Sequence, residues 1–275
     1  MSYLKSLFNV DEKVIVITGG SGTLGSEMAR GFLNAGAKVV LLGTDENKLN
    51  GKVSDLKKSG GEKIIGLICN VLDEENIRVV NNQIVTEFKR IDVLINAAGG
   101  NMTKATIGIG QNIFDMNINE FRKVTDLNLI GTVLPTMIFG KTIADQKSGS
   151  IINISSMAST RVITRVVGYS AAKAGVENFT RWMAVEMAHK FESNIRVNAI
   201  APGFLLTDQN KNLLTKKDGS LTDRGKTIID ITPFKRFGEP DELIGTALWL
   251  ASDASKFVTG IIIPIDGGFL AFSGV

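Results

Sequence analysis

The chain has 275 residues, a formal net charge of +3, one histidine and one cysteine, and its length allows one large α/β domain with a deep core. Its charges form no basic run that would indicate a nucleic-acid partner, its lone cysteine excludes an intrachain disulfide, and one histidine with one cysteine argues against a metal site. No apolar run is long enough to span a membrane and the first residues lack a signal-peptide core, so we expect a cytoplasmic protein without a membrane partner.

Apolar β-branched stretches alternate with helical patterns along the chain. The strands are expected at residues 13–18, 37–42, 63–69, 91–95, 149–155, 195–200 and 260–265. The helices are expected at residues 24–35, 45–59, 73–89, 118–147, 168–190 and 239–252. This alternation predicts a Rossmann-type, doubly wound α/β fold, with a parallel sheet of about seven strands and helices on both faces. Residues 1–275 contain no linker or repeat and are expected to form a single domain.

A glycine-rich turn joins the first expected strand to the first long helix. The strand KVIVIT at 13–18 runs directly into GGSGTLG at 19–25. Glycines let the backbone approach a pyrophosphate, and a helix N-terminus stabilises its charge, so this context predicts a dinucleotide site. The expected pyrophosphate contacts are Gly19, Ser21, Thr23, Leu24 and Gly25.

A second group of chemically informative residues lies around the helix expected at 168–190. Tyr169 and Lys173 are four residues apart and therefore share one face of that helix. A tyrosine hydroxyl titrates near ~10, but a nearby ammonium favours the phenolate and lowers that pKa. Ser156, upstream of both, can donate a hydrogen bond to a carbonyl or alkoxide oxygen. Together these groups can move a proton on or off a hydroxyl-bearing carbon, a reaction that also needs a hydride carrier.

The order of these motifs resembles that of the short-chain dehydrogenase/reductase family over nearly the whole chain. The motifs are TGGSGTLG at 18–25, NAAG at 96–99, Asn128, Ser156, Tyr169, Lys173 and PGFLLT at 202–207. One departure is Thr23, which stands where the family usually has its second glycine, while the neighbouring Gly22 supplies flexibility. The resemblance implies an oxidoreductase that uses NAD or NADP, acts on a CH–OH group and assembles as a homo-oligomer, usually a tetramer.

The resemblance also implies a role for each catalytic position. Tyr169 would be the general acid/base, and Lys173 would lower its pKa and bind the nicotinamide ribose. Ser156 would position the reacting oxygen, and Asn128 would support the lysine through a water. Ser155 is adjacent to Ser156, but strand alternation points its side chain the other way.

Further cofactor contacts are expected beyond the carboxyl ends of the other strands. Asn70 and Val71 would lie beside the adenine, with Asn70 in place of the family's usual acid. Gly43 and Thr44 end the second strand, where the sequence indicates neither the acid that selects NAD nor a cation for the 2′-phosphate of NADP. The preference between NAD and NADP therefore stays open. The remaining contacts implied by the resemblance are Asn96, Ala97, Gly99, Pro202, Gly203, Leu205 and Thr207.

Two arginines indicate the class of substrate. Arg161 and Arg165 lie between Ser156 and Tyr169, in a segment that borders the substrate in the family. Arginine can hold a carboxylate in a two-point fork, so a small, hydroxylated, anionic substrate is predicted. The residues expected to bind this substrate are Ser156, Arg161, Arg165 and Tyr169. The alternative is that both arginines are surface groups or subunit contacts. Residues 204–237 form a polar insertion after a strand, where a substrate lid would sit.

Several stretches resemble one branch of the family, the D-mannonate oxidoreductase (fructuronate reductase) group of hexuronate catabolism. One of them is IDGGFLAFSGV at 265–275. The alternatives are a reductase of another uronate-derived keto acid, gluconate 5-dehydrogenase and 3-oxoacyl carrier-protein reductase. A non-enzymatic dinucleotide-sensing protein on the same fold is a further alternative. Such a sensor would not need tyrosine, lysine, serine and asparagine all in place, which favours an enzyme.

Overall fold

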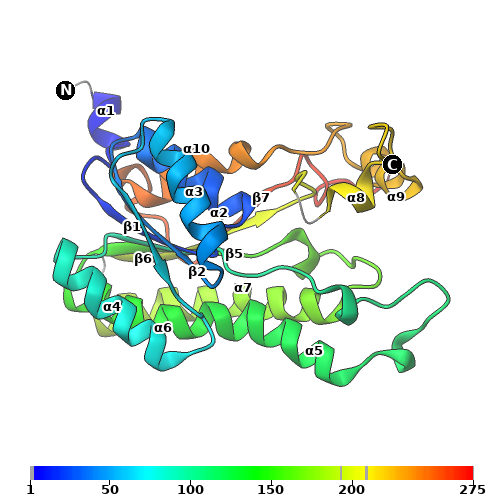
Figure 1. Cartoon of the computed structure of the whole chain (residues 1–275), viewed down its shortest axis with the longest axis horizontal. Coiled ribbons are helices and arrows are strands. Elements are labelled where there is room, and N and C mark those ends of the chain that lie inside the picture. Colours follow the sequence, from blue (N-terminus) through cyan, green and yellow to red (C-terminus); the bar gives the residue numbers. More distant parts are fainter. Residues whose placement is uncertain (1–2, 193, 208–209, 275) are drawn as a thin grey trace.

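The computed structural model describes residues 3–192, 194–207 and 210–274, and it confirms the predicted Rossmann-type architecture (Figure 1). Within these residues, seven strands form one parallel sheet in the order β3-β2-β1-β4-β5-β6-β7. The strands are β1 Val14–Thr18, β2 Lys38–Gly43, β3 Ile64–Ile68, β4 Val93–Asn96, β5 Gly149–Ile154, β6 Ile195–Pro202 and β7 Ile262–Ile265. The strand order reverses between β1 and β4, which is where open α/β sheets bind nucleotides.

Helices cover both faces of the sheet (Figure 1). One face carries α2 (Thr23–Asn34), α3 (Glu46–Lys58) and α10 (Ile244–Ala251). The other face carries α4 (Glu74–Phe88), α6 (Gly131–Asp145) and α7 (Val167–Lys190). The remaining α-helices are α1 Tyr3–Leu7, α5 Ile118–Thr125, α8 Lys211–Leu214 and α9 Asp223–Ile231.

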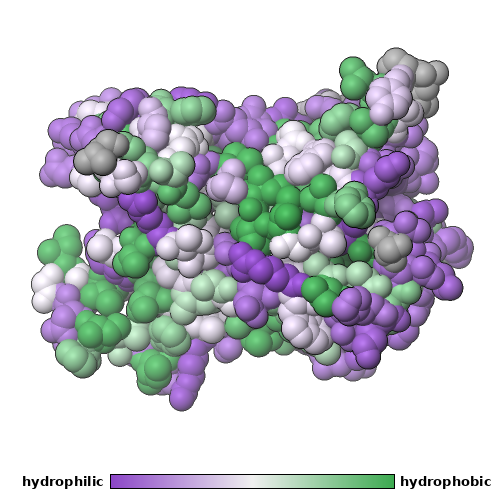
Figure 2. Space-filling view, turned by 180° about the vertical axis from the view of Figure 1, so that it is seen from behind, coloured by the Kyte–Doolittle hydropathy of each residue, from purple (hydrophilic) through white to green (hydrophobic). Residues whose placement is uncertain are grey.

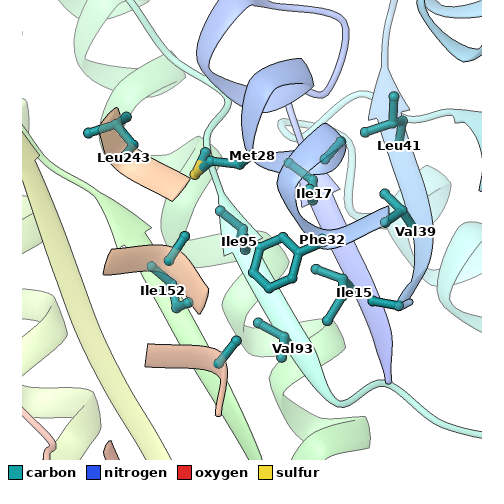
Figure 3. Packing of buried hydrophobic residues seen from close by; sticks show 14 of the residues in the cluster. Ile15, Ile17, Met28, Phe32, Val39, Leu41, Val93, Ile95, Ile152 and Leu243 are labelled. Carbon is teal, nitrogen blue, oxygen red and sulfur yellow. The ribbon is translucent and has the colours of Figure 1, made fainter. Parts of the chain in front are cut away.

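The sheet divides the apolar core into two layers. Alternate residues of a strand face opposite sides, so Ile15 and Ile17 pack with α2 while Val14 and Val16 pack toward α4, α6 and α7. All five residues of β1 are buried, as expected of a central parallel strand covered on both faces. In the first layer Phe32 of α2 lies over the sheet, surrounded by side chains of β1, β2 and β4 (Figure 3).

Two expected helices differ in detail from the structure. The helix expected at 118–147 is interrupted at Asp126–Ile130 by a π-helical turn, an irregularity that is frequent at functional sites. The helix expected at 239–252 begins with a 3₁₀ turn at Pro240–Leu243 before α10. Among the described residues, the stretch Ile118–Asp145 has the length and hydropathy of a membrane span, yet 56% of its apolar window is buried inside the protein. It packs as a core helix.

The polar insertion at 204–237 builds a small unit of its own. It contains α8 and α9, whose Leu214 and Ile228 pack with Phe237 in a separate apolar cluster. An isolated antiparallel β-bridge between Thr215 and Leu221 joins the two ends of the segment that connects α8 to α9. Positions 208–209 lie outside the described residues. The insertion therefore has a framework of its own, and its action as a lid stays a prediction.

Replacing Phe32 by alanine tests the first core layer. Phe32 is fully buried, and Phe32→Ala should lower the free energy of unfolding by about 3–5 kcal/mol through lost burial and a residual cavity. Urea unfolding followed by circular dichroism measures the change. Phe257 is fully exposed, and Phe257→Ala serves as the control that should stay within about 0.5 kcal/mol of the parent. Equal losses in both variants would contradict this account of the core.

Candidate active site

A cleft of about 480 Å³ opens along the carboxyl ends of the strands. In the space-filling view the surface is hollowed between the corner that carries α8 and α9 and the corner formed by residues 100–117 (Figure 2). Most residues expected from the sequence to bind cofactor or substrate line this cleft. They are Gly19, Ser21, Thr23, Leu24, Gly25, Thr44, Asn70, Val71, Ala97, Gly99, Ser156, Tyr169, Lys173, Pro202, Gly203, Leu205 and Thr207. Asn96, Asn128, Arg161 and Arg165 are not among the lining residues.

The turn after β1 has the close backbone approach that a dinucleotide site needs. Gly19 has a φ of +64°, and a Cβ at this position would lie 2.7 Å from the Cα of Ala98. A Cβ on Gly25 would lie 2.6 Å from the carbonyl oxygen of Gly19. Gly22 is the N-cap of α2 and has no side chain to cap the first helical turn. The first turn of α2 therefore faces the cleft in the manner that suits a pyrophosphate.

The residues after β4 are fixed against the residues after β1. The Thr18 hydroxyl oxygen accepts hydrogen bonds from the amides of Ala97 and Ala98, each at 3.1 Å. Asn96 does not face the cleft, because it is buried and its Nδ2 donates to Thr136 and Asn153, each at 2.8 Å. Asn96 therefore braces β4 against α6 and β5, behind the residues that line the cleft.

The adenosine end of the cleft contains a cation that sequence reasoning missed. Lys48 lines the cleft beside Gly43 and Thr44. The Asp45 carboxylate accepts a hydrogen bond from the Lys48 amide at 3.0 Å and so caps α3. This cap places Lys48 in the first turn of α3, from which side chains lean back toward the helix N-terminus. The expectation that no cation lies near the end of β2 is therefore wrong. Asp45 could have indicated this from the sequence, because an aspartate at the N-cap places the residue three positions later in the first helical turn.

The catalytic end of the cleft brings together residues of β5 and α7. The Ser156 side chain lies near enough to Tyr169 to lower the pKa of its hydroxyl, and the Lys173 ammonium lies 5.7 Å from the centre of the Tyr169 ring. Lys173 Nζ donates to the carbonyl of Ile154 at 2.7 Å. This arrangement places a proton donor, a hydroxyl and an ammonium around one open volume.

Burial controls the protonation of these groups. It lowers the pKa of Lys173 to about 8. It also raises the pKa of Tyr169, and the Ser156 side chain opposes that shift without cancelling it. The sequence predicted a lowered tyrosine pKa from the neighbouring ammonium, whereas in the structure desolvation raises this pKa. Tyr169 is therefore a protonated phenol at neutral pH, which is the form that can give a proton to a carbonyl oxygen.

Asn128 lies in the π-helical turn and is fully buried. Its Oδ1 accepts from the amide of Gly100 at 2.9 Å, and its Nδ2 donates to the carbonyls of Gly100 and Val124 at 2.9 and 2.8 Å. A Cβ on Gly99 would lie 2.6 Å from Asn128 Oδ1 and 3.3 Å from Lys173 Nζ. Asn128 thus anchors the loop after β4 at the point where that loop meets the lysine.

The two arginines predicted to bind substrate are both engaged by backbone carbonyls. Arg161 Nη1 donates to Phe272 in the C-terminal segment at 3.0 Å, and its guanidinium lies 5.8 Å from the centre of the Phe269 ring. Arg165 Nε donates to Ile107 at 2.6 Å, and Arg165 has a φ of +76°. Arg161 is tied to the C-terminal segment, whereas Arg165 is an exposed residue that is bonded to the loop of residues 100–117.

A third arginine, Arg224 in α9, joins Arg165. The pKa of Arg224 is lowered by partial burial and then by the positive charge of Arg165. The positive charges of Arg165 and Arg224, which are far apart in the sequence, therefore act on each other in the folded chain. No sequence pattern pointed to Arg224, because its electrostatic interaction with Arg165 exists only in the folded chain. Two neighbouring cations are stabilised by an anion between them.

In the described part of the chain, no three or more His, Cys, Asp or Glu side chains lie together so that they could hold a metal ion. Cys69 is buried just beyond β3. Burial raises the pKa of its thiol to about 12, which keeps it in the unreactive thiol form.

Comparisons with known proteins agree with this geometry. The model of a family described as enoyl-(acyl carrier protein) reductase matches residues 20–270. The chain belongs to the short-chain dehydrogenase/reductase family. It is 45% identical to UxuB of Bacillus subtilis (strain 168), an uncharacterised oxidoreductase, over 97% of this chain and 98% of that protein. It is 35% identical to a 2-dehydro-3-deoxy-D-gluconate 5-dehydrogenase of Formosa agariphila, over 98% of this chain and 96% of that enzyme.

Solved structures of related short-chain dehydrogenases/reductases contain the expected cofactors. A Haemophilus influenzae protein, provisionally named a D-mannonate oxidoreductase, was solved with bound NAD. It superposes with a TM-score of 0.90 at 41% identity and covers 97% of this chain and 98% of its own. A more distant gluconate 5-dehydrogenase contains NADP. The protein is therefore an NAD(P)-dependent oxidoreductase of this family.

Lys48→Ala tests the adenosine end of the cleft. If Lys48 pairs with a 2′-phosphate, its removal should raise KM for NADPH about threefold to fivefold, as an exposed charge pair is worth up to ~1 kcal/mol, and leave KM for NADH unchanged. Thr44→Arg should shift kcat/KM in the opposite direction, toward NADPH. Lys57→Ala, at the far end of α3, is the charge-matched control. An equal effect of Lys48→Ala on both cofactors would remove Lys48 from the phosphate site.

Proposed function

We propose that the enzyme interconverts a secondary alcohol and a ketone on a sugar acid, with D-mannonate and D-fructuronate as the substrate pair. The observation that carries the sugar-acid assignment is the interaction of Arg165 with Arg224 near the helix that bears Tyr169. Two cations that act on each other, the exposed Arg165 and the partly buried Arg224, favour a ligand with a carboxylate. Relatives support the sugar portion, since the Haemophilus protein carries a mannonate oxidoreductase name and the Formosa enzyme acts on a deoxygluconate.

In the direction of reduction, Tyr169 gives its phenolic proton to the ketone oxygen as that oxygen gains negative charge. Ser156 donates a hydrogen bond to the same oxygen and keeps it within reach of the phenol. Lys173 stabilises the phenolate that remains, and the anchored Asn128 loop keeps the lysine in place. The bound nicotinamide supplies the hydride. Oxidation of the alcohol reverses each proton transfer.

A reductase of another uronate-derived keto acid is the second candidate. It is favoured by the 35% identity to the 2-dehydro-3-deoxy-D-gluconate 5-dehydrogenase, whose substrate also joins a carboxylate to a ketone and hydroxyl groups. The unit at 204–237 would close over either substrate as a lid and bring Arg224 of α9 toward Arg165. A cytoplasmic location and a homotetramer belong to the same proposal.

The reaction is tested by mixing the pure protein with NADH or NADPH and a panel of keto acids, and following the absorbance of the reduced nicotinamide. The panel contains D-fructuronate, 2-dehydro-3-deoxy-D-gluconate, 5-dehydro-D-gluconate and an acetoacetyl thioester. The highest kcat/KM should be obtained with D-fructuronate. A preference for the thioester would overturn the sugar-acid assignment in favour of 3-oxoacyl reduction, and cofactor binding without any turnover would favour a dinucleotide sensor.

Tyr169→Phe tests the proposed acid/base. This substitution deletes the proton donor and keeps the ring, so kcat should fall by about 10²–10⁴-fold. The dissociation constant of NADH, measured by fluorescence titration, should change little, because the glycine turn lies at the other end of the cleft. Turnover within a few-fold of the parent enzyme would remove Tyr169 from this role.

Arg165→Ala and Arg224→Ala test the carboxylate site. A charged hydrogen bond is worth roughly 1.5–3 kcal/mol, so each substitution should raise KM for D-fructuronate by at least about tenfold. The value of kcat should change less, since the carboxylate is held similarly in the ground and transition states. Arg122→Ala, an exposed arginine of α5, is the control.

Arg161→Ala tests the alternative that Arg161 itself binds the substrate carboxylate. Because Arg161 holds the C-terminal segment through Phe272, its loss should lower thermal stability more than it raises KM. If Arg161→Ala alone raises KM, Arg161 is the carboxylate ligand. If all three variants keep the parent KM, these arginines are surface or subunit contacts and the substrate assignment rests on resemblance alone.

A further inference from the structure

A buried carboxylate lies directly behind the catalytic serine. Glu177 belongs to α7, one helical turn after Lys173 and two after Tyr169, so the three side chains form one stripe along the helix. Glu177 is only 7% exposed. A carboxylate in such surroundings is costly unless hydrogen bonds and an opposite charge compensate its desolvation. Its partners therefore indicate what this charge does.

The partners of Glu177 flank Ser156 on both sides. Oε1 accepts from the Ser155 hydroxyl at 3.0 Å and also, in a short hydrogen bond, from the Ser159 hydroxyl. Oε2 faces Arg181 Nη2 at 3.4 Å. Ser155 is among the residues that line the cleft, but its hydroxyl donates to helix α7. One carboxylate oxygen holds the residue before the catalytic serine and the residue three positions after it.

The Ser159 hydroxyl has a second acceptor within reach, the carbonyl oxygen of Ser156 at 2.6 Å. A hydroxyl has a single hydrogen to donate, and an ionised carboxylate is a stronger acceptor than a carbonyl. The carbonyl of Ser156 is also served by the backbone amide of Ser159 at 3.0 Å. The Ser159 hydroxyl is therefore free to donate to Glu177, and the backbone hydrogen bond from Ser159 to Ser156 holds the turn together.

The turn itself is short and leaves the sheet. The Ser155 amide still bonds to Ile200 of β6 at 2.8 Å, whereas the next residues form the 3₁₀ turn Met157–Ser159. The Ser156 hydroxyl lies on this turn and Tyr169 lies on α7, so a link between turn and helix sets their separation. Catalytic groups that are misplaced by about 1 Å lose of the order of 10²-fold in rate.

We infer that Glu177 is a positioning residue for catalysis, whose carboxylate clamps the turn 155–159 onto α7 and sets the separation of the Ser156 and Tyr169 hydroxyls. Glu177 does not line the cleft, so a cofactor or substrate bound there would not touch it. It acts through Ser155 and Ser159.

The kinetic test compares Glu177→Leu with Glu177→Gln. Leucine removes both acceptor oxygens, so kcat for D-fructuronate with NADH should fall at least about tenfold while KM for NADH stays within about twofold. Glutamine keeps an amide oxygen that can accept from both serines, so kcat should return to within about threefold of the parent value. Unchanged kcat in Glu177→Leu, or an equal loss in Glu177→Gln, would overturn the clamp.

Thr180→Val is the matched control for a general loss of stability. Thr180 is also buried on α7 and also links this helix to β5, through a 2.9 Å hydrogen bond from Asn153. Its own hydroxyl donates to the carbonyl of Val176 within α7 and not to the serine turn. Its loss should lower the thermal midpoint without lowering kcat. A fall in kcat as large as that of Glu177→Leu would show that any weakening of the helix–sheet contact suffices, and would refute a specific role for Glu177.

Hydrogen exchange tests the clamp without a substrate, because the kinetic test rests on the proposed function. In Glu177→Leu, exchange at the amides of Ala158 and Ser159 should rise at least about tenfold, whereas Thr180→Val should leave it unchanged. Parent-like exchange in Glu177→Leu would overturn the inference.

A parent enzyme that is inactive on D-fructuronate would contradict the proposed function, while the exchange rates would still decide the clamp. If Glu177→Leu does not fold, the double variant Ser155→Ala/Ser159→Ala takes its place in both the kinetic and the exchange measurement, because it removes the two hydroxyls that donate to Glu177.

Discussion

The site depends on the close approach of two backbones at the point where the strand order reverses. Gly19 lies so near Ala98 that even a methyl group would overlap its backbone, and Thr18 bridges the amides of the same segment. This contact joins the turn after β1 to the loop after β4. The first turn of α2 can then face the cleft while the loop after β4 reaches the catalytic lysine. Without it, the two halves of the cleft would not share one volume.

Helix α7 supplies the other half of the chemistry. Its stripe of Tyr169, Lys173 and Glu177 faces the carboxyl end of β5, and each residue bonds to a different part of that segment. Burial along this stripe lowers the lysine pKa to about 8 and raises the tyrosine pKa, so desolvation moves the two values apart and makes the lysine the more acidic group. The helix therefore sets both where the proton donor stands and how readily it exchanges its proton.

Cations stand at both ends of the cleft region although the chain as a whole is nearly neutral. Lys48 lies at the adenosine end, and Arg165 with Arg224 lies toward α9 and the loop of residues 100–117. The pyrophosphate between them would be held by backbone amides of the α2 turn instead of side-chain charges. This separation gives the dinucleotide and an acidic substrate distinct anion contacts.

The sequence by itself determined the sheet, because continuous apolar β-branched runs and the alternation of strands with helices are local patterns. It also determined the order of the motifs. Only the tertiary structure decided the interaction of Arg165 with Arg224, the second layer of contacts through Glu177 and the raised tyrosine pKa. Each of these depends on the distance or burial of groups far apart along the chain, and no local pattern encodes such distances. The separate core of residues 204–237 escaped prediction for the same reason, because its apolar residues are dispersed among polar ones and meet only when α8 and α9 fold together.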